Sequence, residues 1–336
     1  MTATMLRDRL ARMQLVGYGA GFAALATLRS TTLRLSYIVD DNPELHGQAL
    51  LGIPITSPDR LAAADKDASF IIVFAYEAKT IRAIHHGLSA MGFKYLEHWV
   101  DCSPLLYEGV AARLTTSLGI TTHPELFSKT RILSLHTTVD NKSGIAGTWL
   151  SQELLAHVAA AVPGSIAEMG VYKGGHALTS LLISGNAIQG RLYHLFDSFA
   201  GFPELSVHDP LSRSDEFTDV SLSSIEDLFA DFSNARIHVG LFSETLSRVA
   251  SEDFAFVYVD CDLYEPALQC CEFFGERLNP GGIMLFDDYW EPEVDMPKGI
   301  KTPFTGIKKA VDEFFADRPE NVVVFPETAN ALIVKR

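Results

Sequence analysis

Four aspartates stand directly after two apolar runs in the second half of the chain. Asp260 and Asp262 follow "FAFVYV", and Asp287 and Asp288 follow "GGIMLF". Residues two apart on a strand point to the same face, so Asp260 and Asp262 should project together. Clustered carboxylates repel one another unless a cation lies between them. Hard oxygen ligands in this number favour Mg²⁺, with Mn²⁺ or Ca²⁺ as other choices. The structural alternative is a set of solvated acids that cap helices.

The two runs belong to an alternating series of strands and helices that begins at Gly164. We predict strands at 165–171, 191–198, 235–240, 254–260 and 281–288, and helices at 174–184, 221–232, 243–250, 266–278 and 305–317. The segments 321–327 and 331–336 favour a closing hairpin. Alternation of this kind predicts a parallel sheet, and such sheets bind ligands beyond the carboxyl ends of their strands. The aspartates stand at those ends.

The first hundred residues alternate in the same way. Strands are predicted at 13–21, 34–41, 68–76 and 94–101, with helices at 22–30, 57–65 and 77–92. A less regular stretch follows, which we interpret as a linker with helices that cover a neighbouring site. The predicted divisions are 1–104 for a Rossmann-like nucleotide-binding or scaffold domain, 105–163 for linker and lid helices, and 164–336 for a catalytic domain.

Composition limits the classes of function. The net charge of -15 argues against a nucleic-acid partner, because phosphate binding needs clustered Lys and Arg. Residues 1–30 are broken by glycines and lack the order of a signal peptide or a membrane span. No two of the four cysteines form a C-x-x-C pair, which favours reduced, buried thiols. These features predict a cytoplasmic protein that handles small molecules.

Two further strand ends carry residues suited to a nucleoside ligand. "EMGVYKGG" places Glu168 and Gly170 at a strand end and Gly174 at the start of a helix, where free N–H groups point outward. A tight turn without a ligand would look the same. Asp197, in "FDSFAGFPE", stands where an acid accepts hydrogen bonds from ribose hydroxyls. It could equally cap a helix.

The second half resembles the class I S-adenosylmethionine-dependent methyltransferases, and among them the metal-dependent macrocin O-methyltransferase (TylF-like) family that acts on sugars of natural products. The resemblance runs from about Gly164 to the C-terminus. It rests on "EMGVYKGG", "DSFAGFPE", "GLFSETL", "VDCDLYEP", "GGIMLFDDY" and "GIKKAVDEFF", in the family's order. It implies an α/β chain of two Rossmann-like doubly wound domains, the second with the class I methyltransferase fold and a terminal antiparallel hairpin.

The resemblance also implies roles for individual residues. Asp262 matches the general base, and the metal ligands would be Asp260, Asp287 and Asp288, holding Mg²⁺ or another divalent cation. S-adenosyl-L-methionine would be bound by Glu168, Gly170, Val171, Tyr172, Gly174, Asp197 and Ser198. The acceptor would be a sugar hydroxyl of a glycan, a nucleotide-linked sugar or a glycosylated natural product. Relatives further suggest a homo-oligomer.

Parts of the chain depart from the family's pattern. The segment "LHTTVDNKSGIAGTW", which should supply a lid, does not match the family closely. The segment "WEPEVDMPKGIKTPFT" is longer than the family's pattern and could form part of the acceptor pocket. His136 and Trp149, in the first of these, could contact a sugar, although packing in a core is the commoner role of such residues. The acceptor's identity therefore stays open.

The first domain carries an incomplete dinucleotide fingerprint. In "VGYGAGF" a glycine would be needed at Phe22 to complete G-x-G-x-x-G. Gly17, Gly19, Gly21 and Asp40 could hold a nucleotide or the nucleotide part of a sugar donor. A scaffold or dimerisation domain that has lost its ligand is an equal alternative.

Three other functions compete with a methyltransferase. The D-x-D of Asp260 and Asp262 is the pattern by which metal-dependent glycosyltransferases hold a sugar nucleotide, but that function leaves Asp287, Asp288 and "EMGVYKGG" unexplained. An NAD-linked oxidoreductase would need the missing fingerprint glycine. A non-catalytic sugar-nucleotide-binding protein would gain stability from losing its clustered carboxylates.

Overall fold

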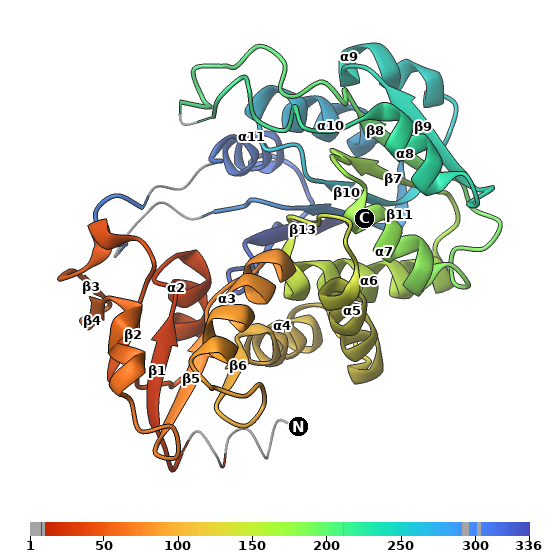
Figure 1. Ribbon diagram of the computed structural model, residues 1–336. Helices are drawn as coiled ribbons and strands as arrows, with labels where there is room; N and C mark the ends of the chain where they lie inside the picture. The colour runs from red at the N-terminus through yellow and green to blue at the C-terminus, as the bar shows by residue number, and fades with distance from the viewer. Residues whose placement is uncertain (1–7, 9–10, 211, 291–295, 301–303) are drawn as a thin grey trace.

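The computed structural model describes residue 8 and residues 11–210, 212–290, 296–300 and 304–336 (Figure 1). The described chain forms two α/β units, each built on its own sheet, which confirms the predicted fold class. The division points at 104 and 163 remain predictions. No helix in the described ranges is long and apolar enough to cross a membrane.

The first unit is a six-stranded sheet in the order β3-β4-β2-β1-β5-β6, in which only β3 runs antiparallel to its neighbour. All four predicted strands are present. The predicted helix at 57–65 is a 3₁₀ helix, and the short β3–β4 hairpin was not predicted. The elements are β1 (Gln14–Tyr18), α2 (Phe22–Ser30), β2 (Tyr37–Val39), η1 (Pro43–Leu45), β3 (Ala49–Leu50), β4 (Ile53–Thr56), η2 (Pro58–Ala63), β5 (Ser69–Val73), α3 (Ala78–Ala90) and β6 (Trp99–Asp101).

The second unit is a seven-stranded sheet in the order β12-β13-β11-β10-β7-β8-β9. Strand β13 runs antiparallel to both β11 and β12, so the predicted closing hairpin is confirmed. The elements are β7 (Ser165–Met169), α7 (Gly175–Ser184), β8 (Tyr193–Asp197), α8 (Leu222–Phe229), β9 (Ala235–Val239), α9 (Phe242–Thr245), η3 (Leu246–Val249), β10 (Phe254–Val259), α10 (Tyr264–Arg277), β11 (Leu278–Phe286), α11 (Gly306–Phe315), β12 (Val323–Phe325) and β13 (Asn330–Val334).

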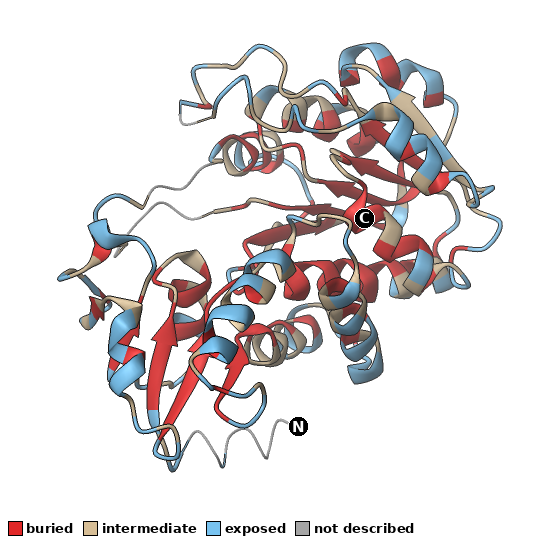
Figure 2. Cartoon of the chain, viewed as in Figure 1, coloured by how far each residue is buried: buried red, intermediate tan, exposed pale blue. Residues whose placement is uncertain are grey.

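Strand composition explains why the central strands lie where they do. Every residue of β10, "FAFVYV", is buried, as expected of a parallel strand with helices on both faces. The central strands of both sheets are buried in Figure 2, whereas the edge strand β9 is partly exposed and the outer faces of the helices are exposed. All four cysteines are buried and unpaired, as predicted.

The segment between the two sheets forms three helices, α4 (Ser103–Leu118), α5 (Pro124–His136) and α6 (Gly144–Ala161). Helices α4 and α6 lie between the units in Figure 1. One hydrophobic cluster contains Val16 of the first sheet, Trp149 of α6 and Tyr258 of the second sheet. The apolar core is therefore continuous across the two units.

Candidate active site

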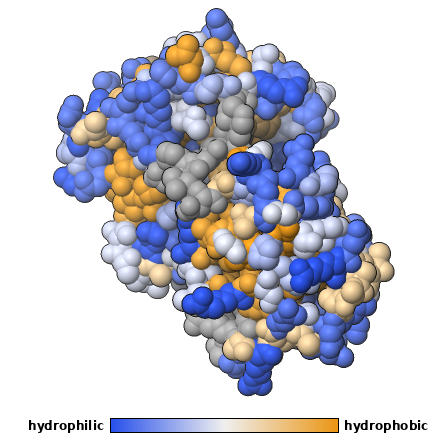
Figure 3. Space-filling view, turned by 90° about the vertical axis from the view of Figure 1, so that its left-hand side faces the viewer, coloured by the Kyte–Doolittle hydropathy of each residue, from blue (hydrophilic) through white to orange (hydrophobic). Residues whose placement is uncertain are grey.

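A cavity of about 820 Å³ opens where the carboxyl ends of the two sheets face each other. Its walls come from the loops after β1 and β5 in the first unit, from residues 140–143 before α6, and from the ends of β7, β8, β10 and β11. Volumes of several hundred cubic ångströms are typical of small-molecule sites. In the space-filling view, hydrophobic residues gather in the middle of the molecule on the face shown (Figure 3).

Three of the four aspartates come together at one wall of this cavity. Asp260, Asp262 and Asp288 each offer a carboxylate oxygen, and these oxygens all lie within 4.8 Å of one another. The register explains the meeting, because Val259 at the end of β10 pairs with Phe286 at the end of β11. The structure thus supplies a set of oxygen donors of the kind that a divalent cation prefers.

Backbone strain accompanies the aspartate trio. Asp262 has a φ of 64° and Asp288 a φ of 50°, both in the left-handed region that non-glycine residues seldom occupy. Aspartate is among the residues that tolerate this region best. Such strain is concentrated at functional sites, where the surrounding structure maintains it.

The electrostatics of the trio also favour a cation. Burial and the neighbouring carboxylates of Asp287 and Asp288 raise the pKa of Asp260 well above its ordinary value. Burial, followed by Asp288 and Asp260, raises the pKa of Asp262 in the same way. Burial raises the pKa of Asp288 as well. A bound divalent cation would remove the penalty for ionising these groups.

Asp287 lies beside the trio, but its carboxylate is engaged elsewhere. Tyr258 donates its hydroxyl hydrogen bond to Asp287 over 2.6 Å, and the side-chain amide of Asn330 donates another over 3.0 Å. Burial and Asp288 raise the pKa of Asp287 to about 7. The oxygen cluster therefore contains the expected base, Asp262, and leaves out one expected metal ligand, Asp287.

The loop from β7 to α7 approaches the aspartates closely. Gly170 has a φ of +92°, and a Cβ atom there would lie 1.8 Å from the carbonyl oxygen of Asp260. The Asp197 carboxylate accepts hydrogen bonds from the backbone N–H groups of Val171 and Tyr172, each over 2.8 Å, and from that of Phe199 over 2.7 Å. Asp197 thus orders this loop while keeping some acceptor capacity toward the cavity.

Six of the seven residues expected to bind the cofactor line the cavity: Glu168, Gly170, Val171, Tyr172, Asp197 and Ser198. Gly174 is the exception. It precedes α7 in the left-handed conformation, and a Cβ atom there would lie 2.9 Å from the side chains of Leu228 and Phe229. Gly174 therefore shapes the turn, and the adjacent Gly175 is the glycine that reaches the cavity.

A buried polar network at the back of the cavity was not predicted. Glu168 accepts a hydrogen bond from the hydroxyl of Tyr193 and contacts Nδ1 of His176, both over 2.8 Å. The His176 ring stacks on Tyr258 at 3.9 Å, and Tyr258 in turn donates to Asp287. His176 lines the cavity, and its buried Nε2 has no hydrogen-bond partner among the described residues. A neutral ring that donates from Nδ1 would present this Nε2 as an acceptor.

Other residues considered from the sequence lie in different places. Trp149 is fully buried against Tyr107 and Phe127, which is a core position, and His136 ends α5 outside the described cavity lining. Trp290 and Phe304 of the segment 290–305 line the cavity, whereas 291–295 and 301–303 fall outside the described residues.

The glycine-rich loop after β1 in the first unit is held in place by Asp40. The Asp40 carboxylate accepts a hydrogen bond from the backbone N–H of Ala20 over 2.7 Å. Gly17 and Gly19 approach Phe74 closely, whereas Gly21 faces open space and lines the cavity. Nucleotide binding by these residues remains a prediction.

Comparisons with known proteins give matches that lie mainly in the second unit. Residues 150–298 match the model of the Macrocin-O-methyltransferase (TylF) family. The 8-demethyl-8-(2,3-dimethoxy-alpha-L-rhamnosyl)-tetracenomycin-C 4'-O-methyltransferase of Streptomyces olivaceus is 30% identical over 140 residues, covering 38% of this chain and 54% of that protein. The mycinamicin III 3''-O-methyltransferase of Micromonospora griseorubida is 28% identical over 145 residues, covering 39% and 57%.

The chain spans about half the length of the curated relatives it matches. The solved structure of the O-methyltransferase NovP aligns with a TM-score of 0.49 at 22% identity, over 69% of this chain and 99% of that one. The family match includes the β7–α7 loop, Asp197 and all four aspartates at the ends of β10 and β11. The match thus relates residues 150–298 of the chain to the macrocin O-methyltransferase (TylF) family.

Proposed function

We propose that the chain is an S-adenosylmethionine-dependent, divalent-metal-dependent O-methyltransferase that acts on a sugar hydroxyl. The observation that carries the proposal is the oxygen cluster of Asp260, Asp262 and Asp288 at a large cavity, within a region that matches the TylF family. Two relatives named as O-methyltransferases, one of them for a rhamnosyl-bearing tetracenomycin, support the reaction type.

The cofactor would lie over the β7–α7 loop. The closeness of Gly170 to the Asp260 carbonyl oxygen brings this loop within reach of the aspartates, as transfer between cofactor and acceptor requires. Asp197 at the end of β8 would accept a hydrogen bond from the ribose, with Ser198 beside it. Glu168, at the back of the cavity, would face the methionine part.

Asp260 and Asp288 are the ligands common to the structural cluster and the family pattern, so we propose that both hold the metal. Asp287, fixed by Tyr258 and Asn330, would orient the adjacent Asp288 or act as a further ligand. When bound, a divalent cation lowers the pKa of a sugar hydroxyl that it contacts. Asp262 would accept the hydroxyl proton as general base.

Calorimetry tests the proposal without knowledge of the acceptor. S-adenosylhomocysteine is titrated into the protein with and without Mg²⁺, and into Asp197→Ala and Asp231→Ala variants. Asp231 is an exposed residue after α8 and serves as the matched control. We expect binding to the wild type and the control, and loss of at least about tenfold in affinity for Asp197→Ala. This substitution removes a charged hydrogen-bond acceptor and also the carboxylate that orders the β7–α7 loop.

A different outcome would change the class of enzyme. Absence of S-adenosylhomocysteine binding, together with Mn²⁺-dependent binding of a UDP-sugar that Asp260→Ala abolishes, would replace the methyltransferase by a glycosyltransferase.

A further inference from the structure

The first unit supplies one side of the cavity, although the family match begins only at residue 150. Phe22, the first residue of α2, and Tyr76, which follows β5, both line the cavity. The position of Tyr76 is fixed, because its carbonyl oxygen accepts a hydrogen bond from the backbone N–H of Ile145 in α6. Two aromatic residues of the first unit therefore line the same cavity as the aspartates of the second.

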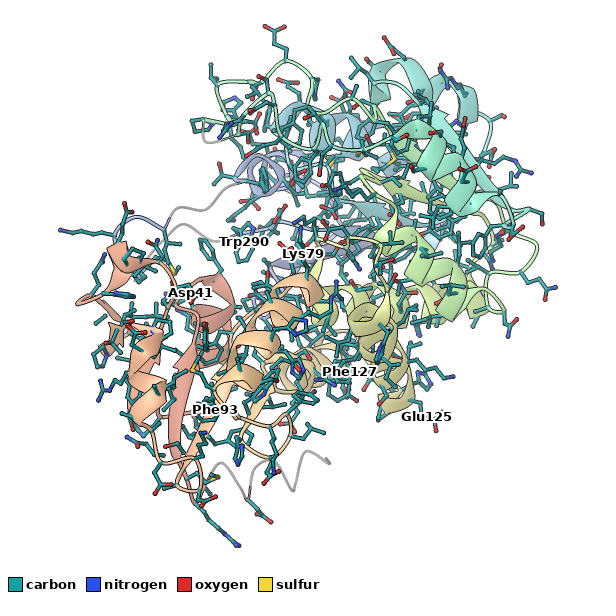
Figure 4. The ribbon with its side chains drawn as sticks, in the orientation of Figure 1. Asp41, Lys79, Phe93, Glu125, Phe127 and Trp290 are labelled. Atoms are coloured by element: carbon teal, nitrogen blue, oxygen red, sulfur yellow. The ribbon has the colours of Figure 1, made fainter. Side chains whose placement is uncertain are left out.

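Trp290 connects these rings to the aspartate trio. Its indole Nε1 donates a hydrogen bond of 2.7 Å to the carboxylate of Asp288. Its ring centroid lies 4.6 Å from that of Phe22 and 6.2 Å from that of Tyr76. Figure 4 shows Trp290 at the junction of the two units. Phe22, Tyr76 and Trp290, here termed the aromatic wall, thus form an apolar surface that begins at the aspartate trio.

The charges outside the trio are predominantly negative. Glu77, Asp140, Glu204 and Glu265 line the cavity, and Lys142 is the one lysine or arginine among the lining residues that the structure describes. The Lys142 ammonium lies 2.9 Å from the Glu77 carboxylate and 3.9 Å from that of Asp140, so its charge is already balanced. A nucleotide diphosphate needs fixed cations or N–H donors, and carboxylates repel it.

We propose that the aromatic wall is the acceptor-binding surface, and that the acceptor is an uncharged glycoside instead of a sugar attached to a nucleotide diphosphate. This inference rests on the proposed methyl transfer to a sugar hydroxyl. With that hydroxyl at the trio, the rest of the acceptor lies next to Trp290. Aromatic rings bury the apolar faces of sugar rings and of attached ring systems, and they add contacts beyond the area that they cover. The first unit would therefore determine acceptor specificity.

Matched pairs of probes test the proposal. 4-Nitrophenyl α-L-rhamnoside and dTDP-L-rhamnose present one sugar with a neutral or a diphosphate group, and 4-nitrophenyl glucoside and UDP-glucose present another. Each probe is titrated calorimetrically into protein loaded with Mg²⁺ and S-adenosylhomocysteine. We expect at least one neutral glycoside to bind about tenfold or more tightly than its diphosphate partner, because carboxylates face the acceptor.

Substitutions test whether the aromatic wall is the surface that binds the acceptor. Tyr76→Ala and Phe22→Ala should each weaken the neutral glycoside about tenfold, since each removes a stacking ring, whereas Tyr76→Phe keeps its ring and its affinity. His86→Ala, which changes an exposed ring of α3 outside the cavity lining, is the control. Unchanged affinity for S-adenosylhomocysteine shows that each variant is folded.

Three results would overturn the proposal. These are tighter binding of a diphosphate probe, failure of every neutral glycoside to bind the loaded protein, and full glycoside affinity in both alanine variants. Loss of S-adenosylhomocysteine binding by the wild type would instead contradict the proposed methyltransferase function, so the two failures are distinct.

Discussion

The buried aspartates predict a specific dependence of stability on pH when divalent metals are removed. Asp287 has a pKa of about 7 in the folded protein, against 3.8 for an ordinary aspartate. Between these values the unfolded chain has lost the proton and the folded chain still holds it. Unfolding therefore releases a proton, and stability falls as pH rises from about 4 to about 7, where the effect levels off.

The magnitude follows from the difference in pKa. At about 1.36 kcal/mol per unit of pKa, Asp287 alone would lower the free energy of unfolding by ~4 kcal/mol over the whole range, and by ~2 kcal/mol between pH 5 and 7. The raised pKa values of Asp260 and Asp262 act in the same direction. A cation replaces the protons, so Mg²⁺ at about 100 times its dissociation constant should restore ~2.7 kcal/mol at pH 8.

Urea denaturation at pH 5 to 8, in chelator and in Mg²⁺, measures both effects. We expect Asp287→Asn to flatten the pH dependence in chelator, and the exposed control Asp231→Asn to keep the wild-type slope. Only the slopes of the free energy of unfolding against pH are compared. A difference in stability between variants that is the same at every pH therefore does not affect the result. A wild-type slope in Asp287→Asn, or no stabilisation of the wild type by Mg²⁺ at pH 8, would refute the assignment of these carboxylates.

Other substitutions test individual parts of the site. Asparagine tolerates a positive φ, so Asp262→Asn should keep the backbone and the affinity for S-adenosylhomocysteine. It should lower turnover of a glycoside by about 10²- to 10⁴-fold, and unaltered steady-state kinetics would exclude Asp262 as base. Gly170→Ala places Cβ against the Asp260 carbonyl and should abolish S-adenosylhomocysteine binding, whereas Gly21→Ala, which meets nothing within 4 Å, should bind normally in the same calorimetric titration. His176→Phe leaves its buried glutamate partner with one fewer hydrogen bond and should cost about 1–3 kcal/mol in urea denaturation; an unchanged midpoint would contradict that contact.

The sequence predicted the parallel strands and the aspartates at their ends because both signals are local. A fully apolar run such as β10 is typical of a buried strand, and its end is marked by Asp260. The β3–β4 hairpin escaped detection because its two-residue loop is Leu51-Gly52. Both residues have positive φ, a conformation usually signalled by Asn-Gly or Asp-Gly.

Long-range arrangements were not predictable in the same way. No spacing rule connects Glu168, His176 and Tyr258, because their contact depends on how α7 packs against the sheet. The oxygen cluster contains Asp262 in place of the expected Asp287. This difference likewise depends on side-chain hydrogen bonds, which Asp287 makes with Tyr258 and Asn330. The approach of Phe22 to Trp290 depends on the relative placement of the two units, which no local pattern in the sequence encodes.

The burial of α6 has a consequence for turnover. Residues 144–155 are buried on every side, and the helix packs on α4 and α5 as well as on β10, β11 and α7. Gln152 anchors it to α7 through hydrogen bonds with Ser180 and Ser184. A helix enclosed in this way does not permit the two units to swing apart like a hinge without breaking the shared core. For the proposed methyl transfer, entry of the acceptor and release of the product would then use smaller movements, such as rotation of side chains at the mouth of the cavity.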